Sequence, residues 1–241
     1  MEVPRLAEQH SRDLVPLFLS LEAPSEETSL QWLRKDRLSL LQLFTKFHNP
    51  RALYKTALVR STLYTLLHNG DSKVQTLALD AILTWKDVEL VTYSGNLHNL
   101  LDETKFREEL TSLVDVDAND SPIQEEHRKE LMEVVIRILF GNALVRHANA
   151  EGKRNAILST LANFRDDEKR IFVDLILLPF SENRGAIQTM GQNYELAEDK
   201  LLPNIDSRKL VGFATMLQHL VKALGGAIAP YLPDLMDALV V

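Results

Sequence analysis

Histidine and carboxylate side chains are the groups in this sequence that could bind a metal ion or transfer protons. Seven histidines are present, but none forms an HExxH or HxxxH pair, the spacings that place two ligands on one helix face. The nearest acidic cluster is Glu125-Glu126-His127, at the expected start of a helix, where the helix dipole stabilises carboxylates. We therefore interpret this cluster as a helix N-terminus rather than a metal site.

Further motif classes could indicate catalysis, and none of them is present. Gly152-Lys153 resembles the end of a P-loop, but His147 stands where a glycine is needed and Arg154 where Ser or Thr is needed. GxSxG and GxGxxG are absent, and a chain without cysteine has no thiol catalysis, disulfides or thiolate metal sites. We expect no enzyme activity, no cofactor and no small-molecule substrate.

Positive charge gathers between His127 and Arg154, where six basic residues outnumber three acidic ones. Arg128 and Arg146 are 18 residues apart and so share one helix face, whereas Arg137 points away from them. The functional interpretation is contact with RNA phosphates or an acidic partner. The charge pattern by itself favours the alternative, a solvated helix flank with salt bridges. The candidate contact residues are Arg128, Lys129, Arg146, Lys153 and Arg154.

The net charge of −7 argues against a nucleic-acid grip that covers the whole surface, and leaves only local basic patches. Hydrophobic residues make up 45% of the chain, which is typical of a protein with a packed core. No uncharged apolar run approaches the roughly 18 residues of a membrane span. The first 20 residues carry several charges and do not resemble a secretory signal. We expect no membrane partner.

Helical periodicity runs through most of the chain, and sustained strand alternation is absent. One helix is expected over 5–21, with an interruption at Pro16, and the longest over 122–149. Over 68–87, Asn69-Gly70 predicts a helix stop and Asp71 an N-cap. The helix that follows is apolar on two sides, because Leu79 and Leu83 lie opposite the stripe from Val74 to Trp85. The sequence predicts an all-α fold.

The helices come in pairs joined by short turns, and one pair, from Asp36 to Asp71, occupies 35 residues. This length and the two-sided helices are typical of a HEAT-like helical-repeat solenoid, in which each helix packs against its partner and against the next pair. We expect one continuous segment over 1–241 with about five to six pairs, and weakly patterned loops near 114–122 and 181–205. Apolar residues near both ends suggest a fragment of a longer array. The alternative is one irregular helical bundle.

Several stretches resemble a known family, the domain family named for the down-regulated-in-metastasis protein. They run from about residue 53 to 180 and include LYTLLHNGDSKVQTLALDAILTWKD, NLHNLLDETKFREELTSL, EEHRKELMEVVIRILFG and GKRNAIL. The last two strings are the most specific, and SRKLVGFATMLQHLVKALGG resembles a continuation of the same repeats. Members of the family carry a basic residue after the RILFG-like string, where this chain has Asn142. The departure weakens the case for an RNA contact at that turn.

The resemblance implies a non-catalytic scaffold of the small-subunit processome in the nucleus and nucleolus, supporting the processing of pre-rRNA to small-subunit rRNA. Its partners would be processome proteins, together with pre-rRNA or U three snoRNA at local basic patches. The alternative function is a HEAT-type peptide- or protein-binding adaptor in transport or vesicle coats, because such folds share the same helix pairs. A helical enzyme is a third and weaker hypothesis, since no spacing here suggests a catalytic pocket.

Overall fold

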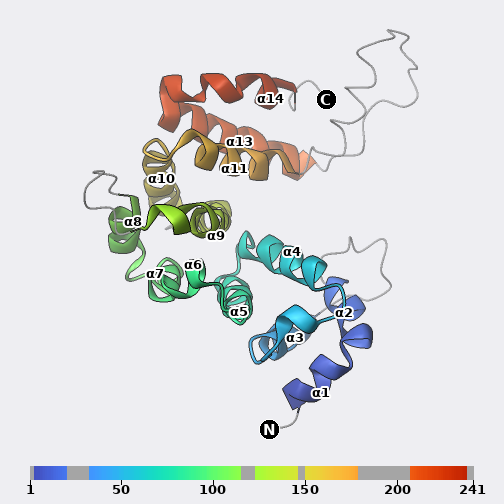
Figure 1. Cartoon of the computed structure of the whole chain (residues 1–241). Helices are drawn as coiled ribbons and strands as arrows, with labels where there is room; N and C mark the ends of the chain where they lie inside the picture. Colours follow the sequence, from blue (N-terminus) through green and yellow to red (C-terminus); the bar gives the residue numbers. More distant parts are fainter. Residues whose placement is uncertain (1–2, 21–32, 115–122, 146–149, 179–206, 238–241) are drawn as a thin grey trace, which may run out of the picture. The chain divides into compact units, whose positions relative to one another are not determined.

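The computed structural model describes residues 3–20, 33–114, 123–145, 150–178 and 207–237. Every regular element within these ranges is a helix (Figure 1), so the all-α prediction is confirmed. The chain divides into two compact units, Met1–Arg154 and Asn155–Val241. Apart from Val114, the loops expected near 114–122 and 181–205 lie outside the described residues. The continuous HEAT-type array remains a prediction.

The first unit begins with α1 (Val3–Gln9), α2 (Ser11–Leu19) and α3 (Arg34–Phe44). The break between the first two helices falls at His10, and Pro16 lies inside α2. Val15 and Phe18 on either side of Pro16 are fully buried. Their burial outweighs the one backbone hydrogen bond that proline cannot donate. The Phe18 ring stacks on Phe44 of α3, with centroids 4.1 Å apart.

The 3₁₀ turn η1 (Pro50–Ala52) precedes α4 (Thr56–Leu67), and a short turn joins α4 to α5 (Ser72–Leu83). The N-cap prediction is confirmed, because the Asp71 carboxylate accepts a hydrogen bond of 3.0 Å from the Lys73 amide. Helix α5 packs against both α3 and α4, and Leu79 is 0% exposed while Leu83 is half-buried. Hydrophobic residues on two sides of α5 therefore serve two neighbouring helices, as the sequence predicts.

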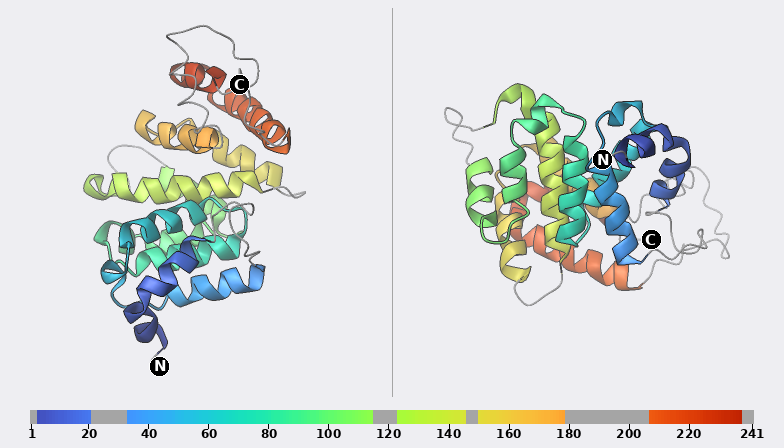
Figure 2. Two further views of the ribbon diagram at one scale, coloured as in Figure 1. Left: turned by 90° about the vertical axis from the view of Figure 1, so that its right-hand side faces the viewer. Right: turned by 90° about the horizontal axis from the view of Figure 1, so that it is seen from below.

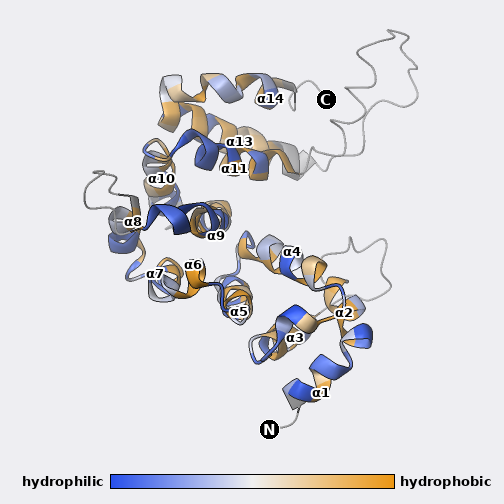
Figure 3. Cartoon of the chain, viewed as in Figure 1, coloured by the Kyte–Doolittle hydropathy of each residue, from blue (hydrophilic) through white to orange (hydrophobic). Residues whose placement is uncertain are grey.

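The rest of the first unit consists of α6 (Val88–Val91), α7 (Ser94–Asn99), α8 (Phe106–Val114), α9 (Glu125–Leu144) and the start of α10 (Ala150–Leu161). With 20 residues, α9 is the long helix expected in this region. It packs against α4 and α6, and Figure 2 shows it in yellow-green beside the cyan α4. Helix α6 is strongly hydrophobic (Figure 3), and its Val88 and Val91 are exposed.

The second unit contains α11 (Asp166–Leu177), α13 (Ser207–Leu224), the 3₁₀ segment η3 (Gly225–Tyr231) and α14 (Leu232–Asp237). Gly225 has a φ of +53°, which L side chains rarely adopt, and it turns the chain after α13. Two contacts tie the end of this run to α11. The Tyr231 hydroxyl donates to the Asp166 carbonyl at 2.9 Å, and Arg170 pairs with Asp234.

One stretch of the described residues, Val211–Met236, is long and apolar enough to cross a membrane by length and composition, and 28% of its apolar window is buried. The stretch is not one straight helix, because Gly225 ends α13 and Pro230 lies within η3. It also carries Lys222 and Asp234. Core helices of water-soluble proteins pass the same test, so we assign no membrane role to it.

Candidate interaction surface

The basic segment 127–154 lies on α9 and on the first turn of α10, but its cations are not equivalent. Arg128 is only 4% exposed, so its side chain is not part of the outer surface expected from the sequence. Lys129, the next residue, is exposed. Arg146 lies outside the described residues. Arg128 lies in α9, as helical periodicity predicts, but periodicity could not show that its side chain is buried in the unit.

Lys153 is half-buried and links α10 to α9 and α8. Its ammonium donates to Asn142 Oδ1 at 3.1 Å and lies 4.3 Å from the centre of the Phe106 ring. Burial lowers the pKa of Lys153, against an opposing effect of Glu103. Asn142 is 4% exposed, and its amide also donates to the Leu100 carbonyl at 3.4 Å. The residue that departs from the family pattern thus forms internal contacts.

Arg154 closes the C-terminal end of α9. Its Nε donates to the Ala143 carbonyl at 2.8 Å, and its Nη2 donates to the Val145 carbonyl at 3.1 Å. The last carbonyls of a helix have no partner within the helix and carry partial negative charge, so a guanidinium is well suited to bind them. Arg154 therefore has a structural role, which leaves less of its charge available to an outside partner.

The interface between α4 and α9 contains a further cationic residue of the basic segment. The guanidinium of Arg137 lies 5.6 Å from the centre of the Tyr64 ring and pairs with Glu133 at 3.1 Å. Arg60 of α4 also lies 5.6 Å from this ring. An aromatic ring attracts cations over its face, so two arginines of different helices share the nearly buried Tyr64. These charges stabilise packing and do not form an exposed RNA-binding row.

Helix α9 is positioned by a close crossing with the turn between α4 and α5. The buried Gln75 amide of α5 donates to the Leu67 carbonyl at 2.6 Å and to the Ile138 carbonyl of α9 at 3.2 Å. Next to it, Gly141 of α9 has no room for a side chain. An added Cβ would lie 2.5 Å from Gln75 Nε2 and 2.8 Å from the Asn69 carbonyl oxygen. Glycine here permits the approach, although it weakens a helix interior.

His68 belongs to the same crossing. It is half-buried, its ring centre lies 6.0 Å from that of Phe140, and its Nε2 has no hydrogen-bond partner among the described residues. Burial, assisted by the positive charge of Arg137, lowers the pKa of His68 to about 4. The imidazole is therefore neutral at physiological pH. A neutral histidine in a packed junction is a structural group in this setting.

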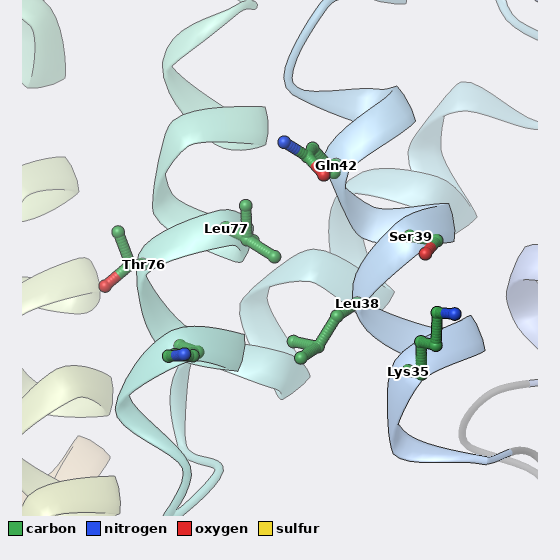
Figure 4. A pocket seen from close by; sticks show the side chains of 7 residues that line it. Lys35, Leu38, Ser39, Gln42, Thr76 and Leu77 are labelled. Carbon is green, nitrogen blue, oxygen red and sulfur yellow. The ribbon is translucent and has the colours of Figure 1, made fainter.

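A groove between α3 and α5, with a volume of about 480 Å³, is open to solvent. Helix α3 contributes Lys35, Leu38, Ser39 and Gln42, and α5 contributes Lys73, Thr76 and Leu77. Figure 4 shows Leu38 and Leu77 pointing toward each other across it. Sequence reasoning missed this groove. One feature of the sequence could have indicated it: helical spacing in α3 places Leu38 among polar residues on the outward face.

Within the ranges that the structure describes, no group of three or more histidines and carboxylates is arranged to hold a metal ion. The histidines nearest to carboxylates form simple pairs. His98 Nε2 lies 2.8 Å from Asp80, and His98 Nδ1 lies 2.6 Å from the Ser94 carbonyl. The contact with Asp80 joins α7 to α5, and the contact with Ser94 lies within α7. In the described residues, the basic segment and the α3–α5 groove are the two candidate surfaces for binding a partner.

Comparison with known proteins identifies similar chains. A family model described as U3 small nucleolar RNA-associated protein 20, N-terminal, matches residues 31–241. A protein of Schizosaccharomyces pombe named U3 small nucleolar RNA-associated protein 20 is 32% identical over 98% of the chain. A protein of the same name from Saccharomyces cerevisiae is 29% identical over 93% of the chain. The chain spans about a tenth of the length of these curated relatives, 10% and 9% respectively.

Proposed function

Because the chain belongs to the family of U3 small nucleolar RNA-associated protein 20, we propose that it is a non-catalytic scaffold segment of the small-subunit processome. In this role it supports the processing of pre-rRNA to small-subunit rRNA. The observation that carries the proposal is the family match, which extends over residues 31–241 and covers most of the first unit and all of the second. The implied location is the nucleolus.

The proposed mechanism is geometric. Paired helices such as α4 and α5 bury their apolar sides against neighbours and leave polar faces for docking. We propose that both units belong to one continuous HEAT-type array, whose long surface contacts several processome proteins at once. A protein with this role needs no catalytic group, because it acts by holding its partners in place.

We further propose that pre-rRNA or U3 snoRNA contacts the basic segment through Lys129 and Arg146. Of the predicted contact residues within the described ranges, Lys129 is the one that is exposed. Lys153 and Arg154 are half-buried and hold α10 against the C-terminal end of α9, so we do not include them in the contact. A small number of phosphate contacts agrees with the overall charge of −7, which opposes extensive RNA binding.

The alternative function, an adaptor in transport or vesicle coats, is not favoured. Both relatives are named for association with U3 small nucleolar RNA, and neither name refers to transport. The two functions predict different locations for the full-length protein. Sucrose-gradient sedimentation of a tagged full-length protein separates them. We expect the protein to sediment with large pre-ribosomal particles that contain U3 snoRNA, and sedimentation with membranes would refute the scaffold proposal.

The RNA contact has its own test in the full-length protein. The double variant Lys129→Glu/Arg146→Glu should reduce crosslinking to RNA several-fold, because each reversal replaces a phosphate-binding charge by a repelling one. The matched control is Arg5→Glu/Arg12→Glu, which makes the same change in net charge at exposed positions of α1 and α2. Equal RNA crosslinking by both variants would count against the contact while leaving the scaffold role intact.

A further inference from the structure

One end of the groove between α3 and α5 lies at the N-termini of both helices, which a salt bridge connects. Arg34 Nε, in the first turn of α3, lies 2.7 Å from Asp71 Oδ2, at the N-cap of α5. Lys35 follows Arg34 directly, Lys73 comes two residues after Asp71, and both lysines line the groove near this end. Both lysine side chains are exposed. The groove therefore has a cationic end where the two helices start.

The middle of the groove is apolar. Leu38 and Leu77 lie on facing helices, point toward each other and are only half-buried (Figure 4). The opposite face of α3 supplies the core residues Leu40, Leu41 and Phe44. Leu38 is thus an apolar residue on the outward face, and the fold itself buries it incompletely. Covering both leucines would remove apolar surface from water and favour binding.

The charges around the groove favour an acidic occupant. Asp71 is engaged by Arg34 and by the Lys73 amide, and Asp80, one turn beyond Leu77 on α5, is engaged by His98 at 2.8 Å. Among the described residues, no carboxylate forms an ion pair with the ammonium of Lys35 or Lys73. The two lysines remain available for carboxylates of another molecule. The groove is locally positive although the chain is acidic.

We propose that this groove docks an acidic amphipathic segment of a protein partner. Apolar side chains of that segment cover Leu38 and Leu77, and its carboxylates pair with Lys35 and Lys73. A volume of about 480 Å³ accommodates a few side chains of one helical face. RNA fits less well, because the lining has no aromatic residue for base stacking and no arginine. The inference concerns a protein partner and does not depend on the RNA contact proposed above.

A binding measurement on the 241-residue chain tests the proposal. The probe is a fluorescein-labelled helical peptide of about 16 residues, with leucines every third and fourth position and glutamates between them. The matched peptide has lysine in place of each glutamate. We expect fluorescence anisotropy to show binding of the acidic peptide and at least about tenfold weaker binding of the basic one, with the difference reduced by salt.

Substitutions in the protein locate the binding site. Lys35→Glu/Lys73→Glu should weaken binding of the acidic peptide by about tenfold or more, and Leu38→Gln should weaken it by about fivefold. Lys105→Glu/Arg107→Glu, an equal charge change at exposed positions near the start of α8, is the control and should leave binding within about twofold. The substituted side chains are exposed or half-buried, and far-UV circular dichroism checks the fold.

Three outcomes would overturn the inference. The first is no binding of the acidic peptide to the wild-type chain, and the second is equal loss of binding in the groove and control variants. The third uses a single-stranded RNA of about 20 nucleotides. If that RNA binds the wild-type chain, and only the groove variant loses it, the occupant is RNA. None of these outcomes bears on co-sedimentation with pre-ribosomes, so the scaffold proposal stands or falls separately.

Discussion

Replacing Gly141 by alanine should destabilise the first unit, even though alanine is the better helix former. The added Cβ would lie 2.5 Å from Gln75 Nε2, 2.8 Å from the Asn69 carbonyl oxygen and 2.9 Å from the His68 carbonyl carbon. Two of these three neighbours are backbone atoms of the α4–α5 turn, which cannot move aside as a flexible side chain can. The turn and α9 must therefore separate, and the Gln75 amide must shift away from its two acceptors.

The magnitude follows from three opposing terms. Alanine is favoured over glycine in a helix interior by about 1 kcal/mol. Overpacking a closed site costs about 1–3 kcal/mol, and a buried amide that loses its hydrogen bonds costs about 1–3 kcal/mol. The midpoints of these ranges give a net loss of about 3 kcal/mol in the free energy of unfolding. In urea this corresponds to a midpoint lower by about 1–2 M.

The assay is urea unfolding followed by tryptophan fluorescence. The chain has two tryptophans, Trp32 and Trp85, and Trp85 is buried at the end of α5 in the first unit. Both tryptophans fall within the bounds of the first unit, so the signal reports on this unit, and a Trp32→Phe background restricts the signal to Trp85. The matched control is Gly95→Ala in α7, where a Cβ meets no atom within 4 Å. The control should be neutral or more stable by up to about 1 kcal/mol.

The opposite signs of these two glycine substitutions test the reasoning. If Gly141→Ala is as stable as the wild type, the close crossing described here does not exist in solution. A double-mutant cycle with Gln75→Ala provides a second check. Removing the Gln75 side chain eliminates the nearest obstacle, so the double variant should be less destabilised than the sum of the single variants. Strict additivity would contradict the contact between Gly141 and Gln75.

Two further predictions concern the same region. Between pH 6.5 and about 4 the unfolded chain protonates His68 while the folded chain does not. Stability therefore falls as the pH falls through this window, by up to about 3 kcal/mol. Urea unfolding at several pH values should show a smaller loss in His68→Gln, and identical profiles would exclude His68 as a source. The Arg154→Gln substitution should lower the free energy of unfolding by about 1–2 kcal/mol, because two carbonyls at the end of α9 lose a charged donor. The same measurement on Lys129→Gln, which removes one charge from an exposed position, should show a change below about 0.5 kcal/mol, and equal losses would contradict the capping role.

The local structure of this chain follows closely from its residues. Asp71 begins α5 as a side-chain cap because its carboxylate reaches an amide two residues later, a contact that needs no distant partner. The two-sided apolar pattern of α5 predicts that it lies between other helices, and α3 and α4 flank it. The prediction of a break at Pro16 was wrong, because the helix continues through this proline and breaks at His10. The packing of Phe18 against Phe44 of α3 stabilises the helix beyond Pro16, and this contact is not visible in the local sequence.

The candidate site was less predictable than the helices. The sequence shows six cations between residues 127 and 154, but charge alone does not reveal whether a long side chain faces water or a neighbouring helix. Arg128 is buried, Lys153 binds Asn142, and Arg154 binds the end of α9. Each of these uses depends on residues brought close by folding. The α3–α5 groove was missed for the same reason, since its two leucines are 39 residues apart.

The sequence by itself determined most of the helices, the cap at Asp71 and the family resemblance, because these depend on short-range spacing and on similarity along the chain. Only the tertiary structure decided which charges remain available to partners. A lysine or arginine has the same charge wherever it lies, but its hydrogen bonds and exposure depend on the helices packed around it. Lys129 and the lysines of the α3–α5 groove remain open to solvent, whereas Arg128 is buried and Arg154 binds the end of α9.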